Sequence, residues 1–218
     1  NNLALSIIDE EHKFGVSQRE VLETKSEYGV HNIIMSATPI PRTLAMTIHG
    51  SHVDIYDIKS RPKGRKPIET IYSQKEEEVY EFMYSEIEKG RQCYVVCPLV
   101  DTSEKMENVD TVKNTYDKLI KYFKDRNVNI GMVYGKDKKQ SEIDMEIRRF
   151  TNNEYQILVS TTVVEVGVNV PNSTVILIKN AERFGLAQLH QLRGRVGRSE
   201  HQSYCVLLSE KKDKKIEV

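Results

Sequence analysis

The sequence predicts an α/β protein built on a mostly parallel sheet, and two observations support this prediction. Short apolar runs alternate with longer segments in which apolar residues recur at helical spacing. Two of the runs lead directly into polar or acidic residues, which is typical of strands that end at a ligand-binding edge. We therefore expect strands that are buried on both faces and covered by helices.

Seven apolar runs are predicted to be buried strands. They lie at residues 5–8, 33–35, 94–97, 130–134, 157–159, 175–178 and 205–208. Three helices are predicted between them, because apolar residues recur at i, i+3, i+4 and i+7. Their apolar faces are Val79, Phe82, Met83 and Ile87; Val112, Tyr116, Leu119, Ile120 and Phe123; and Ile143, Ile147 and Phe150. Pro41 and Gly50 bracket a further predicted helix.

A domain boundary is predicted at residues 60–67, where two prolines, one glycine and four basic residues occur together. Such a composition makes a poor core and a good linker. Two predicted strands precede this segment and five follow it. We expect residues 1–60 to be part of one domain, residues 61–67 to be a linker, and residues 68–218 to form a second, complete domain.

The overall composition excludes some classes of protein. The 32 basic and 32 acidic residues give zero formal net charge, so a protein that coats nucleic acid through general positive charge is not indicated. Cys93, Cys97 and Cys205 are odd in number and lie in apolar runs, which predicts buried reduced thiols. No signal peptide or membrane span is visible, and we expect a cytoplasmic protein without a membrane partner.

Residues 191–198 read Gln-Leu-Arg-Gly-Arg-Val-Gly-Arg and concentrate positive charge on one short segment. Guanidinium groups match phosphate oxygens, so the octet is suited to hold a polyphosphate. Gly194 and Gly197 are poor helix residues, and both indicate a close approach of something to the backbone. The alternative interpretation is the basic, solvated end of a helix.

The first apolar run ends in acidic residues, Asp9 and Glu10. A carboxylate at the end of a buried strand can hold Mg²⁺, usually through water, and a neighbouring one can orient or deprotonate an attacking water. A solvated acidic loop is an equally good interpretation of these two residues alone.

Four segments occur together in a fixed order: Asp9-Glu10-Glu11-His12, Ser36-Ala37-Thr38, residues 161–171 with the pattern TTxxExGxNxP, and residues 191–198. In this order they resemble motifs II, III, V and VI of superfamily 2 helicases. Residues 37–45, 64–67, 94–99 and 180–191 are similar to RecG-type ATP-dependent DNA helicases, and the similarity runs from about residue 3 to residue 208. Transcription-repair coupling factors share this motor and are the alternative.

The resemblance implies a RecA-like fold, a P-loop NTPase-type lobe with a parallel sheet and flanking helices, and ATP and Mg²⁺ as cofactors. It implies that Asp9 holds the metal through water, that Glu10 acts on the attacking water, and that His12 connects the nucleotide site to the next motif. Ser36, Thr38 and Glu165 are expected to couple hydrolysis to movement of the lobes. Residues 1–60 then correspond to the C-terminal part of a first lobe.

In the second lobe, the resemblance implies that Arg195 and Arg198 reach the β- and γ-phosphates and that Gln191 senses the γ-phosphate. Arg198 is our choice for the arginine finger, while Arg193 is expected to pair with a nearby acid. Gly167 and Asn169 are expected near the nucleotide. The sequence departs from the family pattern at Asn169, where aspartate is expected, and at Glu11, where glutamine is usual.

The DNA partner, branched or duplex, is expected to lie on four other residues: Thr161, Thr162, Gly135 and Lys136. A simple turn between strand and helix is an equally good interpretation of the last two. The chain contains no G-x-x-x-x-G-K-S/T loop, so we expect a piece of a longer motor that also carries this loop and an N-terminal wedge domain. We expect the isolated chain to hydrolyse no ATP. The alternative of another class is a non-catalytic nucleic-acid or protein binding module.

Overall fold

The computed structural model describes residues 3–9, 29–36, 54–58, 60, 64–98, 105–134, 140–162 and 170–209; for 105–110 and 140 it describes the backbone alone. The chain divides into two compact units, residues 1–60 and 61–218, and each is described by itself. No helix within the described ranges is long and apolar enough to cross a membrane.

The first unit contains two parallel strands, β1 (Leu5–Asp9) and β2 (His31–Met35). They pair with Ile7 opposite Ile33 and Asp9 opposite Met35. Both segments were expected to be buried, but every residue of β2 is exposed and β1 buries only every second residue. A two-stranded sheet cannot bury both faces by itself, and no described helix of this unit covers it.

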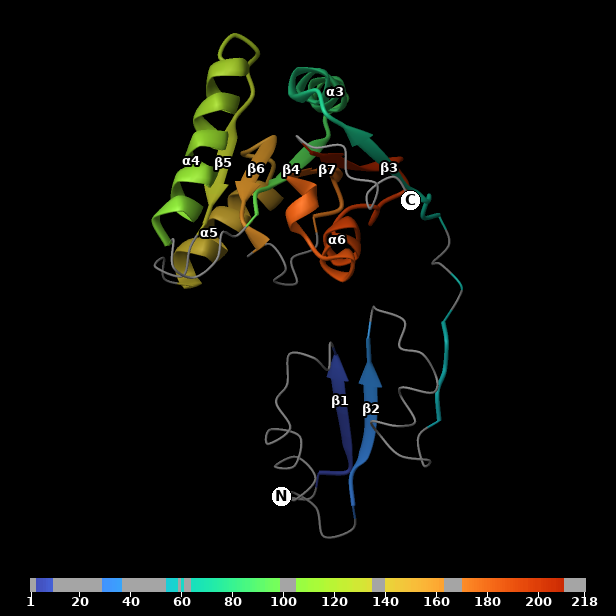
Figure 1. Ribbon diagram of the computed structural model, residues 1–218. Coiled ribbons are helices and arrows are strands. Elements are labelled where there is room, and N and C mark those ends of the chain that lie inside the picture. The colour runs from blue at the N-terminus through green and yellow to red at the C-terminus, as the bar shows by residue number, and fades with distance from the viewer. Residues whose placement is uncertain are drawn as a thin grey trace. The chain divides into compact units, whose positions relative to one another are not determined.

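The second unit is built on a six-stranded parallel sheet in the order β3-β8-β7-β4-β6-β5 (Figure 1). Its strands are β3 (Ile68–Ser73), β4 (Gln92–Val96), β5 (Ile130–Val133), β6 (Ile157–Ser160), β7 (Ser173–Lys179) and β8 (Ser203–Leu208). Because all pairings are parallel, the carboxyl ends of the strands lie along one edge of the sheet.

Two helices cover each face of this sheet (Figure 1). The helices are α3 (Glu76–Glu88), α4 (Lys105–Tyr122), α5 (Gln140–Thr151) and α6 (Leu186–Arg193), with a short 3₁₀ turn, η3 (Ala181–Arg183), before α6. Helices α3 and α4 pack on one face through Met83 and Leu119, among others. Helices α5 and α6 pack on the other through Phe150 and Leu192. This arrangement confirms the predicted α/β class with a covered parallel sheet.

The burial of individual strands follows their place in the sheet. All residues of β4 and β6 are buried, which explains why their sequences read as continuous apolar runs. Strand β3 lies at the edge, is partly exposed along its length and has only one neighbour. This strand was not predicted, because Ile68, Ile71 and Tyr72 form neither a run nor a regular alternation.

Two details of the predicted core can be checked directly. The three cysteines are buried and free, as expected, and burial raises the pKa of the Cys205 thiol to about 12. Ile120 was expected on the buried face of its helix. This prediction is wrong, since Ile120 is 42% exposed. It lies one residue beyond Leu119, so the helix turns it away from the sheet.

Candidate functional site

In the first unit, two predicted site residues lie at the carboxyl ends of neighbouring strands. Asp9 is the last residue of β1, and Ser36 directly follows β2, which pairs with β1 through Met35 and Asp9. Both residues are exposed. The predicted site residues Glu10, His12 and Thr38, and the helix predicted at 41–50, lie outside the described residues.

Asp9 offers a carboxylate suited to a hard cation such as Mg²⁺, which binds oxygen ligands and keeps several waters. Because the side chain is exposed at the strand end, it has room for a hydrated ion, and it therefore fits the water-mediated contact expected of it. The described residues contain no group of three or more His, Cys, Asp or Glu that could hold a metal directly.

In the second unit, Thr161 and Thr162 directly follow β6 at the carboxyl edge of the sheet. Both are buried. Within the described ranges, neither Ser160 Oγ nor Thr161 Oγ1 has a hydrogen-bond partner. An unpaired buried hydroxyl costs about 1–3 kcal/mol, so these atoms mark a place where a further polar group is to be expected.

Five further predicted site residues follow strand ends of the second unit. Glu165, Gly167 and Asn169 follow Thr162 along the chain, and Gly135 and Lys136 follow β5. All five lie outside the described residues.

The octet 191–198 consists of the last turn of α6 and the tight turn that follows it. The backbone N–H of Arg195 donates to the Leu192 carbonyl at 3.0 Å, and Arg198 Nε donates to the Gly194 carbonyl at 3.4 Å. The buried side chains of Leu192 and Val196 anchor the turn in the core. Gln191, Arg195 and Arg198 are therefore half-buried side chains on a segment that the core holds in place.

The described neighbour of the Arg193 guanidinium is a histidine. Its Nη2 is 3.5 Å from His190 Nδ1, and none of the ion pairs found among the described residues joins it to a carboxylate. Its charge also acts on the buried Cys205 thiol, where it opposes the effect of burial on the pKa. None of the described carboxylates supplies the expected partner of Arg193, and the pairing with an acid stays a prediction.

The two glycines of the octet differ. Gly197 has φ +75°, and a Cβ there would lie 2.7 Å from Ile68 Cγ1 of β3. Gly194 has φ −67°, and a Cβ there would meet its nearest described neighbour, the Gln191 carbonyl oxygen, at 3.4 Å. The expected close approach is therefore found at Gly197, while no described residue makes one at Gly194.

Tyr94, in the middle of β4, packs in the same core as Leu192 and Val196 of the octet. Burial raises the pKa of its phenol to about 12, and the positive charges of Arg198 and Arg195 act in the opposite direction. Both guanidinium groups therefore lie within electrostatic reach of one buried hydroxyl. The two arginines, separated by two residues in the sequence, are brought to the same side of the sheet.

Comparison with known proteins identifies the family. Residues 74–200 match the helicase conserved C-terminal domain. The chain belongs to the helicase conserved C-terminal domain family. It is 50% identical over 214 residues to the ATP-dependent DNA helicase RecG of Staphylococcus epidermidis. The aligned part covers 97% of this chain and 31% of that protein. The RecG of Staphylococcus aureus is also 50% identical, over 97% of this chain and 30% of its own length.

Among solved structures, RecG bound to a three-way DNA junction matches with a TM-score of 0.75 and 38% identity, over 99% of this chain and 27% of that one. The resemblance to RecG inferred from the motifs is thus confirmed, and so is the RecA-like helicase lobe. The chain spans about a third of the length of its curated RecG relatives.

The sequence assigned no role to Tyr94, Glu182 or Ser199, although Tyr94 and Glu182 lie in segments that resemble RecG. Tyr94 reads as an ordinary core residue, because nothing in its neighbourhood along the chain points to the arginines. Glu182 Oε2 and Ser199 Oγ are buried and have no hydrogen-bond partner among the described residues. Glu182 precedes α6 and Ser199 follows Arg198, so unpaired polar atoms flank the octet on both sides along the chain. No sequence pattern predicts which buried polar atoms lack a hydrogen-bond partner.

Gly197→Ala in this domain is expected to lower the free energy of unfolding by about 1–3 kcal/mol, because alanine is strained at positive φ. The added Cβ would also press on Ile68. The midpoint of urea unfolding measures the effect. Gly194→Ala is the matched control in the same segment, and its ordinary φ predicts a change within about 0.5 kcal/mol. Equal destabilisation by the two substitutions would contradict this account of Gly197.

Proposed function

We propose that this chain is part of the motor of an ATP-dependent DNA helicase of the RecG type, which remodels branched DNA such as forks and Holliday junctions. The observation that carries the proposal is the 50% identity over 97% of the chain to proteins named ATP-dependent DNA helicase RecG. The placement of Arg195 and Arg198 on a core-anchored turn is the geometry that this activity needs. A cytoplasmic location stays a prediction.

The proposal assigns residues 1–60 to the C-terminal part of a first RecA-like lobe, residues 61–67 to a linker and residues 68–218 to the second lobe. The division of the chain after residue 60 supports this assignment. The Walker A loop and a wedge domain would belong to other parts of the full-length protein.

In the first lobe, Asp9 would hold Mg²⁺ through water, and the ion would neutralise charge on the ATP phosphates. Glu10 would orient the attacking water and accept its proton. His12 would connect this site to Ser36 and Thr38, which would couple hydrolysis to lobe movement together with Glu165. The position of Ser36 beside the end of β1 supports its part in this set.

In the second lobe, Arg195 and Arg198 would contact the β- and γ-phosphates, with Arg198 as the arginine finger and Gln191 as the γ-phosphate sensor. Gly167 would let the backbone approach the nucleotide, and the amide of Asn169 would bond a ribose hydroxyl. A planar guanidinium offers paired donors that match phosphate oxygens, and the half-buried positions of both arginines limit their freedom before ATP binds.

DNA would contact the carboxyl edge of the second-lobe sheet. Thr161 and Thr162 would donate hydrogen bonds to a backbone phosphate, which positions the strand without reading sequence. Their position directly after β6, at this edge of the sheet, supports this role. Gly135 and Lys136 would add a backbone amide and a positive charge at the neighbouring strand end.

The first experiment is the ATPase activity of the full-length protein on fork DNA, with wild type compared to Glu10→Gln. Loss of the general base is expected to lower turnover by about 10²–10⁴-fold. Glu11→Gln is the matched control: it removes the adjacent carboxylate, to which no catalytic role is assigned, and should keep most of the activity.

The outcomes separate the candidate functions. Fork-stimulated activity that only Glu10→Gln abolishes supports a RecG-type motor. Equal activity on linear duplex and fork would favour a coupling-factor translocase instead. A wild-type protein that binds DNA but never hydrolyses ATP would indicate a binding module.

A further inference from the structure

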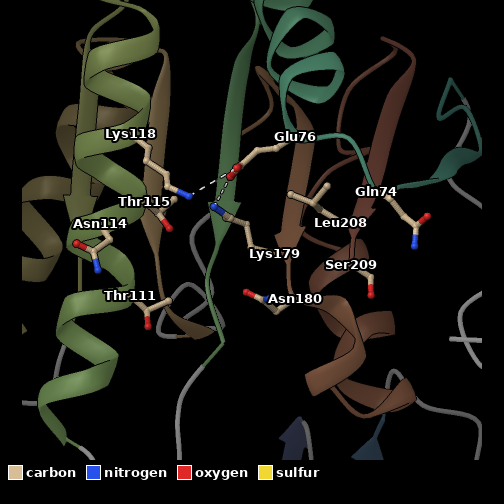
Figure 2. A pocket seen from close by; sticks show the side chains of 10 residues that line it. All are labelled: Gln74, Glu76, Thr111, Asn114, Thr115, Lys118, Lys179, Asn180, Leu208 and Ser209. Carbon is tan, nitrogen blue, oxygen red and sulfur yellow. Dashed lines mark hydrogen bonds and ion pairs between the residues drawn. The ribbon is translucent and has the colours of Figure 1, made fainter. Parts of the chain in front are cut away.

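A polar cavity of about 290 Å³ opens on the α3–α4 face of the second unit, at the carboxyl ends of β3, β7 and β8 (Figure 2). The proposed catalytic set and the proposed DNA contacts do not include its lining residues. The lining residues used below are Glu76, Asn114, Lys118, Lys179, Asn180 and Leu208. They come from α3, α4, β7, the residue after β7, and β8, so only the folded sheet assembles them. We call this cavity the Lys118 pocket.

The charges of the Lys118 pocket leave a positive excess. Lys179 Nζ donates to Glu76 Oε1 at 2.5 Å, and Lys118 Nζ lies 3.7 Å from Glu76 Oε2 (Figure 2). The Tyr80 hydroxyl also donates to Glu76 Oε1, at 2.6 Å. Burial would raise the pKa of Glu76, but the bonds from Lys179 and Tyr80 outweigh it and the pKa lies below its usual value. One ionised carboxylate therefore faces two ammonium groups.

Lys118 is the ammonium that remains available. Its side chain is 63% exposed, whereas that of Lys179 is 12% exposed and committed to Glu76. An ammonium carries three donors, and its contact with Glu76 is beyond hydrogen-bond length. The free donors of Lys118 thus lie at the mouth of a pocket whose single carboxylate is already paired.

Asn180 contributes a second donor in an unusual way. It precedes η3 at the N-cap position with a left-handed backbone, φ +51°, and its side chain makes no capping hydrogen bond. Asparagine at this position normally caps the turn, and left-handed non-glycine residues gather at functional sites. Here the Asn180 side chain lines the pocket instead, as does that of Asn114 on α4.

The lining also indicates what the pocket does not hold. Among the described residues, the lining includes one apolar side chain, Leu208, and no aromatic ring. A nucleobase or an apolar peptide side chain would find no stacking surface there. The chemistry fits a small, oxygen-rich anion that accepts hydrogen bonds from an ammonium and amides, which is the chemistry of a phosphate diester.

The pocket lies along the same edge of the sheet as the proposed DNA contacts. Strand β7 ends at the pocket and β6 ends at Ser160, directly before Thr161, with β4 between the two strands. Two strand spacings separate β7 from β6, or about 10 Å. A polynucleotide that rests on Thr161 therefore has a second phosphate site within the reach of one strand.

We propose that the Lys118 pocket binds a phosphodiester group of the DNA strand that passes Thr161, with Lys118 and Asn180 as the donors. This inference rests on the proposed DNA-binding function and adds a contact to it. The pocket is a positioning site for the backbone and takes no part in ATP hydrolysis.

The salt dependence of fork-DNA binding by the full-length protein tests the proposal. Each neutralised phosphate contributes about 0.9 to the slope of log K against log salt on duplex DNA, and about 0.7 on single strands. Lys118→Gln is expected to lower the slope by that amount, so its loss of affinity is about threefold larger at 50 mM than at 200 mM salt. Lys113→Gln, on the same helix but outside the pocket, should leave the slope unchanged.

Acylation of lysines followed by mass spectrometry supplies a second readout on the wild-type protein. Fork DNA should protect Lys118 and leave Lys113 reactive, and inorganic phosphate at millimolar concentration should protect neither. If both DNA and phosphate protected Lys118, the ligand of the pocket would be a free anion and not the DNA strand. If the protein still binds forks but the Lys118→Gln slope is unchanged and Lys118 is not protected, the proposed phosphate site is wrong and the proposed function stands. Absence of fork binding by the wild type would overturn the proposed function as well.

Discussion

Replacing Arg198 with alanine in the full-length protein is expected to lower DNA-stimulated ATP turnover by about 10³-fold or more, the usual effect of losing an arginine finger. Its affinity for fork DNA should change little. The reason is placement: Arg198 lies on the turn after α6, which Val196 anchors in the core, and its Nε is held by the Gly194 carbonyl. The side chain can therefore stabilise phosphate charge without an ordering step. Steady-state turnover and fork anisotropy measure the two quantities.

Arg193→Ala is the control for this experiment, because it removes a guanidinium of the same octet that lies beside His190. It should keep turnover within a few-fold of wild type. Arg198→Lys should remain strongly impaired, since an ammonium cannot present the planar pair of donors. If Arg198→Ala instead lost fork binding and kept turnover, Arg198 would be a DNA contact and the assignment would be reversed.

The central part of the fold could be predicted from the sequence because burial leaves a local mark there. Strands β4, β6 and β7 are covered on both faces and read as apolar runs, and α3 to α5 show the helical spacing of one buried stripe. The edge strand β3 leaves no such mark, since half of its environment is solvent. The exposed strand β2 shows the converse: its apolar run predicts burial that the two-stranded sheet cannot supply.

Some residues of the candidate site could likewise be identified from the sequence, and others could not. Arg195, Arg198 and Thr161 could be singled out from the sequence because they belong to short segments that resemble helicase motifs, and their roles stay predictions. Tyr94 could not, because its relation to the arginines exists only after β4 and α6 have packed on the same core. The Lys118 pocket is assembled from separate helices and strand ends, and none of these segments carries a recognisable pattern alone.

Phe150→Ala is expected to cost about 3–5 kcal/mol of folding free energy, the usual range for removing a buried aromatic side chain. Phe150 is fully buried at the end of α5, and its ring lies 4.9 Å from that of Tyr94, centroid to centroid. Its backbone carbonyl accepts a hydrogen bond of 2.6 Å from the buried Gln92 side chain. The cavity would therefore open between α5 and β4, beside the Tyr94 ring.

Urea unfolding followed by circular dichroism measures this loss for the complete chain. Met145→Ala is the control on the same helix, because Met145 is exposed and its truncation should change stability by less than about 0.5 kcal/mol. Equal midpoints for the two variants would mean that α5 does not pack on β4 as described. Phe150→Leu, which refills most of the volume, should recover most of the stability. In the full-length protein it should recover turnover in parallel, if the core under Tyr94 is what holds Arg195 and Arg198 in position.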